Sequence, residues 1–350
     1  MTTAAPGPDS VHGAESAGRE TVGPVLARLA QPTTEETTRI AVVADPHVTP
    51  TAEGTWKVYH RTEARFRAAI DVVNDLGPDA TLFLGDLTKD GAPAEFALVD
   101  EILSGLTSPA VAVPGNHDVP KQWDEYETPT VDSFGDRYGR GRYPFRVAVG
   151  GLDLVCLDSA TGDGDLRDTH VGRVSEAQLD WLDDTLDTPT DARTTRTPVV
   201  ALHHNLLHAR RHTGEFPDAA FYRLQNADAL RAVLSRHGVP LVLSGHLHWP
   251  AAATRDDVRE LLAPATCSFP QAVLVLDVTD GGTTVRLVPI ADREGVAEAY
   301  THARTGSAHG QGVAEHAERG YFGDLPAFVE GAASESQETD VPGSAVRWSR

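Results

Sequence analysis

Cysteine is scarce in this chain, which has only Cys156 and Cys267 among its 350 residues. Both lie in apolar stretches, so we predict small core residues rather than a disulfide framework. Neither has a cluster of cysteine and histidine around it, which excludes a structural zinc site built on these two residues. This use of cysteine favours a reducing compartment, and we expect the protein to be cytoplasmic.

Long apolar runs are missing as well. No stretch approaches the roughly 18 apolar residues that a membrane-spanning helix needs, and the first residues lack the basic start and apolar run of a secretory signal. With 40% hydrophobic residues the chain can bury one large core. We predict one main domain over residues 39–290, with partly disordered extensions over residues 1–38 and 291–350, where polar and small residues dominate.

Positive charge is the third scarce property. Lys57, Lys89 and Lys121 are the only lysines, and the formal net charge is −21. Such an acidic surface repels nucleic acid and anionic membranes, which argues against both as partners. At about 1 M salt the Debye length falls to about 3 Å, so the self-repulsion is screened. The composition resembles that of proteins from salt-loving archaea, and we predict better folding in molar KCl.

Short apolar segments alternate with segments rich in helix formers, which predicts an α/β fold with layers of sheet and helix. Each apolar segment is rich in β-branched residues, as in strands buried on both faces. Two further segments, residues 272–278 and 284–290, predict a hairpin that closes the second sheet. The predicted strands are residues 40–44, 81–84, 110–113, 199–202 and 241–243, and the predicted helices are residues 62–76, 92–103, 175–186 and 226–237.

A polar motif follows each of these five strands. In open α/β sheets, groups at the carboxyl ends of strands converge on one site even when they are distant in sequence. A single aspartate there is usually a turn former or a helix cap, but seven such residues at five strand ends need a common explanation. Gly-Asn-His-Asp alone has a chance frequency of roughly 0.002 in a chain of this length. The motifs are Asp45-Pro46-His47, Gly85-Asp86, Gly115-Asn116-His117-Asp118, His203-His204 and Gly245-His246-Leu247-His248.

In order and spacing, these motifs resemble those of the calcineurin-like metallophosphoesterase superfamily over residues 39–290. The stretch from Gly85 to Gly91, with Pro93 and Glu95-Phe96, is similar to the class III cyclic-nucleotide phosphodiesterases within it. The resemblance implies a four-layer α/β/β/α sandwich with a dimetal site at the carboxyl ends of the strands. It also implies that residues 39–290 are the catalytic domain.

The resemblance further implies a set of metal ligands. Asp86 would bridge the two ions. Carboxylate, amide oxygen and imidazole together suit Mn, Fe, Zn or Co, of which we favour Mn or Fe, and two ions roughly 3.5 to 4 Å apart can activate water for attack on a phosphoester. The first ion would be held by Asp45, His47 and His248, and the second by Asn116, His203 and His246.

Other side chains are assigned to substrate. His117 would protonate the leaving alkoxide or stabilise phosphoryl charge, with Asp118 fixing its tautomer. His204, Asn116 and His117 would contact substrate. Four further histidines lie in loops that could border the site, namely His60, His170, His208 and His212. The histidines at positions 302, 309 and 316 lie in a polar tail and are given no role.

We therefore expect a metal-dependent phosphodiesterase acting on a small phosphoester such as a 3',5'-cyclic nucleotide. A phosphomonoesterase or nucleotidase with the same dimetal site is the main alternative. A DNA nuclease is disfavoured by the acidic surface, and a non-catalytic binding module by the presence of every expected ligand. The sequence leaves the oligomeric state open, with a homodimer as one candidate.

Overall fold

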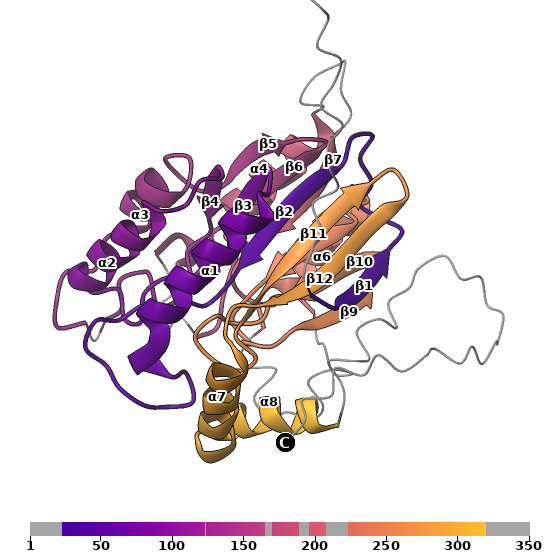
Figure 1. The fold of residues 1–350 in the computed structure, drawn as a ribbon. Coiled ribbons are helices and arrows are strands. Elements are labelled where there is room, and N and C mark those ends of the chain that lie inside the picture. Colours follow the sequence, from indigo (N-terminus) through magenta and orange to yellow (C-terminus); the bar gives the residue numbers. More distant parts are fainter. Residues whose placement is uncertain (1–22, 123, 165–169, 189–195, 208–222, 320–350) are drawn as a thin grey trace, which may run out of the picture.

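The computed structural model describes residues 23–122, 124–164, 170–188, 196–207 and 223–319. Two six-stranded sheets pack face to face, and helices cover their outer faces (Figure 1). The predicted four-layer α/β/β/α sandwich is confirmed. An apolar core fills the space between the two sheets. Leu82 and Leu84 contribute to it from the side of the first sheet, and Leu154 and Leu243 from the second.

The first sheet contains three of the predicted strands, side by side and parallel. It also contains the predicted hairpin, which was wrongly assigned to the second sheet. The hairpin pairs with the strand that precedes Asp45, and an ion pair of 2.6 Å between Arg39 Nε and Asp277 Oδ1 supports this register. The order is β1 (Val25–Leu29), β12 (Gly282–Pro289), β11 (Ala272–Thr279), β2 (Thr38–Val43), β3 (Ala80–Phe83) and β4 (Ala110–Ala112).

Strand β1 lies in the predicted N-terminal extension and pairs antiparallel with β12. In the second sheet, β6, β7, β8 and β10 are parallel, and β5 and β9 add antiparallel edges. The order is β5 (Phe145–Val149), β6 (Leu152–Cys156), β7 (Thr197–Ala201), β8 (Leu241–Ser244), β10 (Val258–Leu262) and β9 (Ala251–Arg255).

The four predicted helices are confirmed. Helix α1 buries Phe66, Ile70 and Val73 at helical spacing against the outer face of the first sheet. Helix α4 begins after Ser175, whose side chain accepts a hydrogen bond from Gln178 N at 3.2 Å and so caps the helix. The helices of the two main outer layers are α1 (Thr62–Leu76), α2 (Pro93–Leu103), α3 (Val131–Tyr138), α4 (Glu176–Asp187) and α6 (Ala227–Arg236).

Two more helices, α7 (Arg293–Thr305) and α8 (Ala308–Glu318), pack beside the end of the sandwich (Figure 1). They share an apolar cluster with Leu247 and Trp249. His309 and His316 are buried on α8, which corrects their assignment to a polar tail. Among the described residues, none of the helices combines the length and apolar character needed to cross a membrane.

Candidate metal centre

The five motifs lie just beyond the carboxyl ends of β2, β3, β4, β7 and β8. Both sheets contribute, because the first three strands belong to one sheet and the last two to the other. All seven predicted ligands are almost completely buried. The first sheet supplies Asp45, His47, Asp86 and Asn116, and the second supplies His203, His246 and His248.

Five of these seven residues have a left-handed backbone, which is uncommon outside glycine and costs free energy. Their φ values are 51° for Asp45, 44° for His47, 52° for Asp86, 70° for His246 and 65° for His248. Neighbouring motifs hold this geometry, since Asp45 N donates to Gly85 O at 3.1 Å and His47 N donates to Asp86 O at 2.9 Å. Strain concentrated at one set of strand ends is typical of a functional site.

Gly115 is required by the close approach of two motifs. A Cβ atom at this position would lie 2.2 Å from both Asp86 N and Asp86 Oδ1. Any larger residue would push the Asn116 loop away from Asp86. The glycine of Gly-Asn-His-Asp therefore has a packing role that fixes the distance between two of the predicted ligands.

The donors form two groups that share one atom. In the first group, His47 Nε2 lies 3.2 Å from His248 Nε2 and 3.3 Å from Asp86 Oδ2. Asp45 Oδ1 lies 3.5 Å from His248 Nε2. In the second group, His203 Nε2 lies 3.0 Å from His246 Nδ1, 3.1 Å from Asn116 Oδ1 and 3.4 Å from Asp86 Oδ2. Asp86 Oδ2 therefore belongs to both groups.

This arrangement fits two cations. Buried imidazole nitrogens about 3 Å apart, with carboxylate oxygens at similar distances, can share a metal ion as ligands. The protein itself places a cation here, because Lys57 Nζ lies 3.0 Å from His47 Nε2. The mixture of oxygen and nitrogen donors suits Mn, Fe, Zn or Co better than Mg or Ca.

Burial controls the charge of several ligands. It raises the pKa of Asp45 to about 7, because the carboxylate is removed from water. It also lowers the pKa values of His47, His246 and His248 well below their ordinary value. These three imidazoles are therefore neutral, which is the form that binds metal.

Asp86 and His203 behave differently because they face each other. Burial alone would raise the pKa of Asp86, but the neighbouring His203 holds it well below its ordinary range. Burial alone would lower the pKa of His203, but Asp86 outweighs it and raises the pKa to about 9. The shared atom of the two donor groups thus belongs to an ionised carboxylate.

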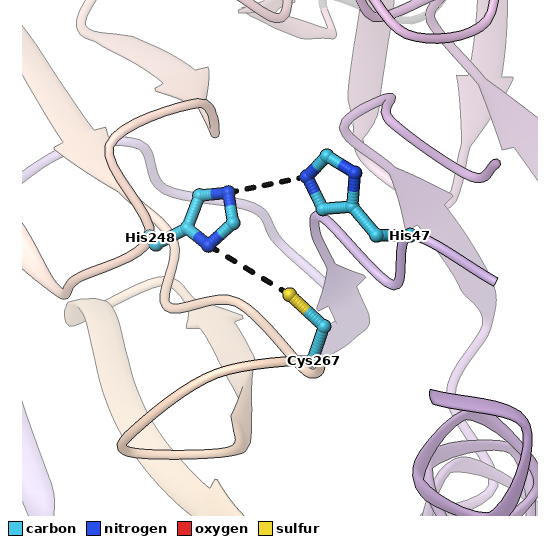
Figure 2. Close-up of side chains that lie close together, drawn as sticks. All are labelled: His47, His248 and Cys267. Atoms are coloured by element: carbon cyan, nitrogen blue, oxygen red, sulfur yellow. Dashed lines mark hydrogen bonds between the residues drawn. The ribbon is translucent and has the colours of Figure 1, made fainter. Parts of the chain in front are cut away.

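Outer contacts orient the ligand rings. His203 Nδ1 donates to Leu84 O at 2.7 Å, and His248 Nδ1 lies 3.0 Å from Ser268 Oγ. Such contacts leave Nε2 to face the centre. Figure 2 shows a further neighbour that the sequence did not reveal, Cys267, whose Sγ lies 3.7 Å from His248 Nδ1. Cys267 belongs to no motif, and burial raises the pKa of its thiol.

The predicted relation between His117 and Asp118 is wrong. Asp118 accepts hydrogen bonds from Leu87 N at 3.1 Å, Thr88 N at 2.9 Å and Gly115 N at 3.1 Å, as well as from the Thr88 hydroxyl. It therefore joins two motif loops and does not orient His117. The Nδ1 atom of His117 contacts the carbonyl oxygen of Lys89 instead.

His117 itself lies at the centre. Its ring is edge-on to that of His47, with 4.6 Å between the ring centroids, and its backbone N donates to Asp86 Oδ1 at 2.8 Å. Burial lowers the pKa of His117 to about 3. His117 is thus next to both donor groups, where a substrate held between them would reach it.

The remaining predicted histidines lie in different places. His204 is buried, with Nδ1 3.0 Å from Ser159 Oγ and its ring 4.5 Å from that of His246. His170 borders the site, because its carbonyl oxygen lies 3.2 Å from His246 Nε2. His60 pairs with Glu298 of α7 at 3.1 Å. His208 and His212 lie outside the described residues.

Lys57 is the residue at the centre that sequence reasoning missed most clearly. It belongs to no motif and comes from the loop between the first motif and helix α1. The only signal was the rarity of lysine in the chain. Rarity alone does not indicate a site, so contact with His47 became visible only in three dimensions.

Comparisons with known proteins agree with this geometry. Residues 38–250 match the calcineurin-like phosphoesterase family. The chain is 29% identical over 231 residues to a 3',5'-cyclic-nucleotide phosphodiesterase of Nostoc sp., covering 65% of this chain and 78% of that protein. It is 29% identical over 255 residues to a cAMP/cGMP dual specificity phosphodiesterase of Mycobacterium tuberculosis, covering 70% and 71%.

Among solved structures, a dimetal phosphatase from Danio rerio has a TM-score of 0.57 at 15% identity, covering 73% of this chain and 97% of its own. This likeness supports the sandwich fold. The two sequence relatives are bacterial, so they give no support to the archaeal origin that the composition suggested.

Proposed function

Because the chain belongs to the calcineurin-like phosphoesterase family and is a phosphoric-ester hydrolase, we propose that it hydrolyses small phosphodiesters, with 3',5'-cyclic nucleotides as the substrate class. The observation that carries this proposal is the position of Asp86 Oδ2, which lies 3.3 Å from His47 Nε2 and 3.4 Å from His203 Nε2. One carboxylate oxygen is thereby shared by two donor groups.

We assign each donor group to one divalent ion, with Mn or Fe favoured. Asp45, His47 and His248 would hold the first ion, and Asn116, His203 and His246 the second, with Asp86 between them. Such a pair of ions supplies Lewis-acid activation of water and of the phosphoryl group. The rigid strand ends of two sheets set the spacing of the donors, so the protein provides orientation before the substrate arrives.

His117 is the proposed proton donor to the leaving oxygen. Its Nδ1 atom is engaged by the Lys89 carbonyl, which leaves Nε2 for the substrate. As the leaving alkoxide develops negative charge, it would take the proton from Nε2–H of the protonated ring, against the lowering of the His117 pKa by burial. The neighbouring His204 and Asn116 are the other proposed substrate contacts.

The test is hydrolysis of bis(p-nitrophenyl) phosphate compared with p-nitrophenyl phosphate, using Mn-loaded protein, metal-stripped protein and Asp86→Ala. We expect metal-dependent activity that prefers the diester and is lost in Asp86→Ala. Cyclic AMP and cyclic GMP would then be tested as substrates. Each reaction should be run at low and at molar KCl, because the chain carries a formal net charge of −21.

The same donor set can serve a phosphomonoesterase or nucleotidase, and this experiment separates the two. A preference for p-nitrophenyl phosphate would replace the diesterase proposal with that alternative. Absence of hydrolysis of either compound and of cyclic nucleotides by protein that has bound its metal would contradict both.

A further inference from the structure

The three lysines of this acidic chain all lie near the metal centre, but they do different things. Lys121 Nζ donates to the carbonyl oxygens of Asp90 at 2.9 Å, His117 at 3.2 Å and Val119 at 3.1 Å, so it holds loop backbone together. Lys89 Nζ pairs with Asp90 and lies 5.2 Å from the centre of the Tyr59 ring. Lys57 Nζ instead contacts a predicted metal ligand, His47 Nε2, at 3.0 Å.

The backbone on both sides of Lys57 is held in place. Trp56 packs its ring 4.8 Å from that of His248 and 4.8 Å from that of His309 on α8. Val58 is fully buried. The residue therefore has a fixed attachment point, while its four-carbon stem and ammonium group can turn about several bonds.

The Lys57 ammonium acts on the first donor group. The contact with His47 uses the Nε2 lone pair, which is also the proposed metal ligand. Because one lone pair serves one cation at a time, an ion bound there has to displace the ammonium.

We propose that Lys57 is a tethered cation with two positions, an inference that rests on the proposed dimetal function. Without an ion in the first donor group, its ammonium group contacts His47 Nε2. When an ion binds His47, the ammonium moves outward and binds an oxygen of the substrate's phosphoryl group.

The direction of this movement follows from burial. His47 and Asp45 are fully buried, whereas Lys57 is part-buried and reaches them from a loop whose residues Glu53 and Thr55 are exposed. Repulsion from the bound ion therefore drives the ammonium toward the exposed loop side. An ammonium beside the ion is well placed for a phosphoryl oxygen, with which it forms a charge-assisted hydrogen bond.

The first measurement is the affinity for Mn²⁺ by calorimetric titration of metal-stripped wild type, Lys57→Met, Lys57→Arg and Lys89→Met. Methionine keeps an unbranched stem and removes the charge, and Lys89→Met is the matched control that removes another lysine charge near the centre. We expect Lys57→Met to bind one Mn²⁺ about tenfold more tightly than the wild type, since no charge-assisted contact has to be broken. Lys57→Arg, which keeps the charge, and Lys89→Met should bind Mn²⁺ less tightly than Lys57→Met.

The second measurement is inhibition of the Mn-saturated enzyme by inorganic phosphate, together with KM and kcat for bis(p-nitrophenyl) phosphate. For Lys57→Met we expect about a tenfold weaker inhibition and a higher KM, with Lys57→Arg, which keeps the charge, closer to the wild type. Each metal-stripped variant should still unfold in one cooperative thermal transition, which shows that the loop substitution has not unfolded the protein.

The outcomes separate this inference from the proposed function. Equal Mn²⁺ affinity in Lys57→Met and Lys89→Met would show that the Lys57 ammonium does not compete with the ion for His47. Unchanged inhibition by phosphate in Lys57→Met would show that the displaced ammonium does not bind the phosphoryl group. Neither result would contradict the proposed phosphoesterase activity. If the variants bind Mn²⁺ as expected but no form hydrolyses a phosphoester, the proposed function fails while the tethered cation stands. If no variant binds Mn²⁺, both fall.

Discussion

At the scale of single residues, His117 shows how a ring is oriented without a carboxylate partner. Its Nδ1 atom contacts the Lys89 carbonyl, and its ring packs edge-on against His47. A backbone carbonyl accepts a hydrogen bond as a carboxylate does, but it adds no negative charge beside the ring. His117 is therefore oriented without a further negative charge being added to the metal centre.

His117→Ala therefore tests proton donation without leaving a carboxylate without its partner. We expect both ions to stay bound and kcat to fall roughly 100 to 10,000-fold on a substrate with a poor leaving group such as cyclic AMP. The loss should be much smaller for bis(p-nitrophenyl) phosphate, whose leaving group needs no proton. Metal content by elemental analysis is the control, and equal losses on the two substrates would exclude the role.

Asp118 offers a contrasting prediction. Three backbone N–H groups and one hydroxyl donate to its buried carboxylate, so Asp118→Asn would place an amide donor against other donors. We expect a loss of about 1 to 3 kcal/mol in the free energy of unfolding. Urea unfolding of the metal-stripped protein measures it. A stable variant whose pH–rate profile alone is altered would instead restore the link between Asp118 and His117.

At the scale of elements, strand β10 supports the loop after His203-His204. Its residue Glu260 accepts hydrogen bonds from Leu206 N at 2.8 Å, Leu207 N at 2.6 Å and Ser244 Oγ at 2.6 Å. Burial nevertheless raises the pKa of Glu260 from 4.5 to about 7. One buried carboxylate thus ties together the loop after β7 and the end of β8, two segments that carry predicted ligands.

The sign of this pKa shift predicts a pH dependence. Because the folded state holds the Glu260 proton more tightly than the unfolded state, its contribution to stability is present below about pH 4.5 and is lost as the pH rises to about 7. The free energy of unfolding of the wild type should therefore fall, relative to Glu260→Gln, by at most about 3 kcal/mol over this range. Urea unfolding at pH 5 and pH 7.5 measures the difference, and parallel pH curves would contradict it.

Helix α8 packs closely on the loop that carries Trp56 and Lys57. A Cβ atom at Gly310 would lie 2.9 Å from Trp56 Cβ and 3.0 Å from Ala303 O. Alanine usually favours a helix over glycine by about 1 kcal/mol, but here the clash should outweigh this gain and destabilise the protein by about 1 to 3 kcal/mol.

Thermal unfolding of Gly310→Ala measures this effect. The matched control is Gly281→Ala, because a Cβ atom there would meet only Thr279 Oγ1, at 3.7 Å. A variant at Gly310 that is more stable than the wild type would show that α8 can move away from the loop without cost.

Sequence and structure agree where the signal is local. Helix α1 spans the predicted residues 62–76, since its apolar spacing is unambiguous. The hairpin was predicted but placed in the wrong sheet. The order of apolar residues within a strand does not specify which strand pairs with it, because that choice depends on tertiary contacts. Lys57 and Cys267 reach the centre from segments without a motif, so their roles depend on packing alone.

At the scale of the whole molecule, the net charge predicts how stability depends on salt. The formal net charge of −21 produces self-repulsion that molar KCl screens, whereas exposed ion pairs such as Arg67 with Glu101 contribute little and are screened too. We expect the melting temperature to rise between dilute buffer and about 2 M KCl. Sucrose at matched osmolality is the control for solvent exclusion. Equal stability in dilute buffer and in KCl would contradict the prediction.

The placement of β2 between β3 and β11 also has a consequence for synthesis on the ribosome. Strand β2 comes early in the chain, but its neighbour on one side begins at Ala272 and the partner of β1 begins at Gly282. The nascent chain therefore carries an unpaired edge of β2 until β11 has been synthesised, a state in which strand edges associate wrongly. We expect the first sheet to close only after β11 and β12 have emerged, so the edge of β2 that pairs with β11 is the one that a chaperone can cover for longest.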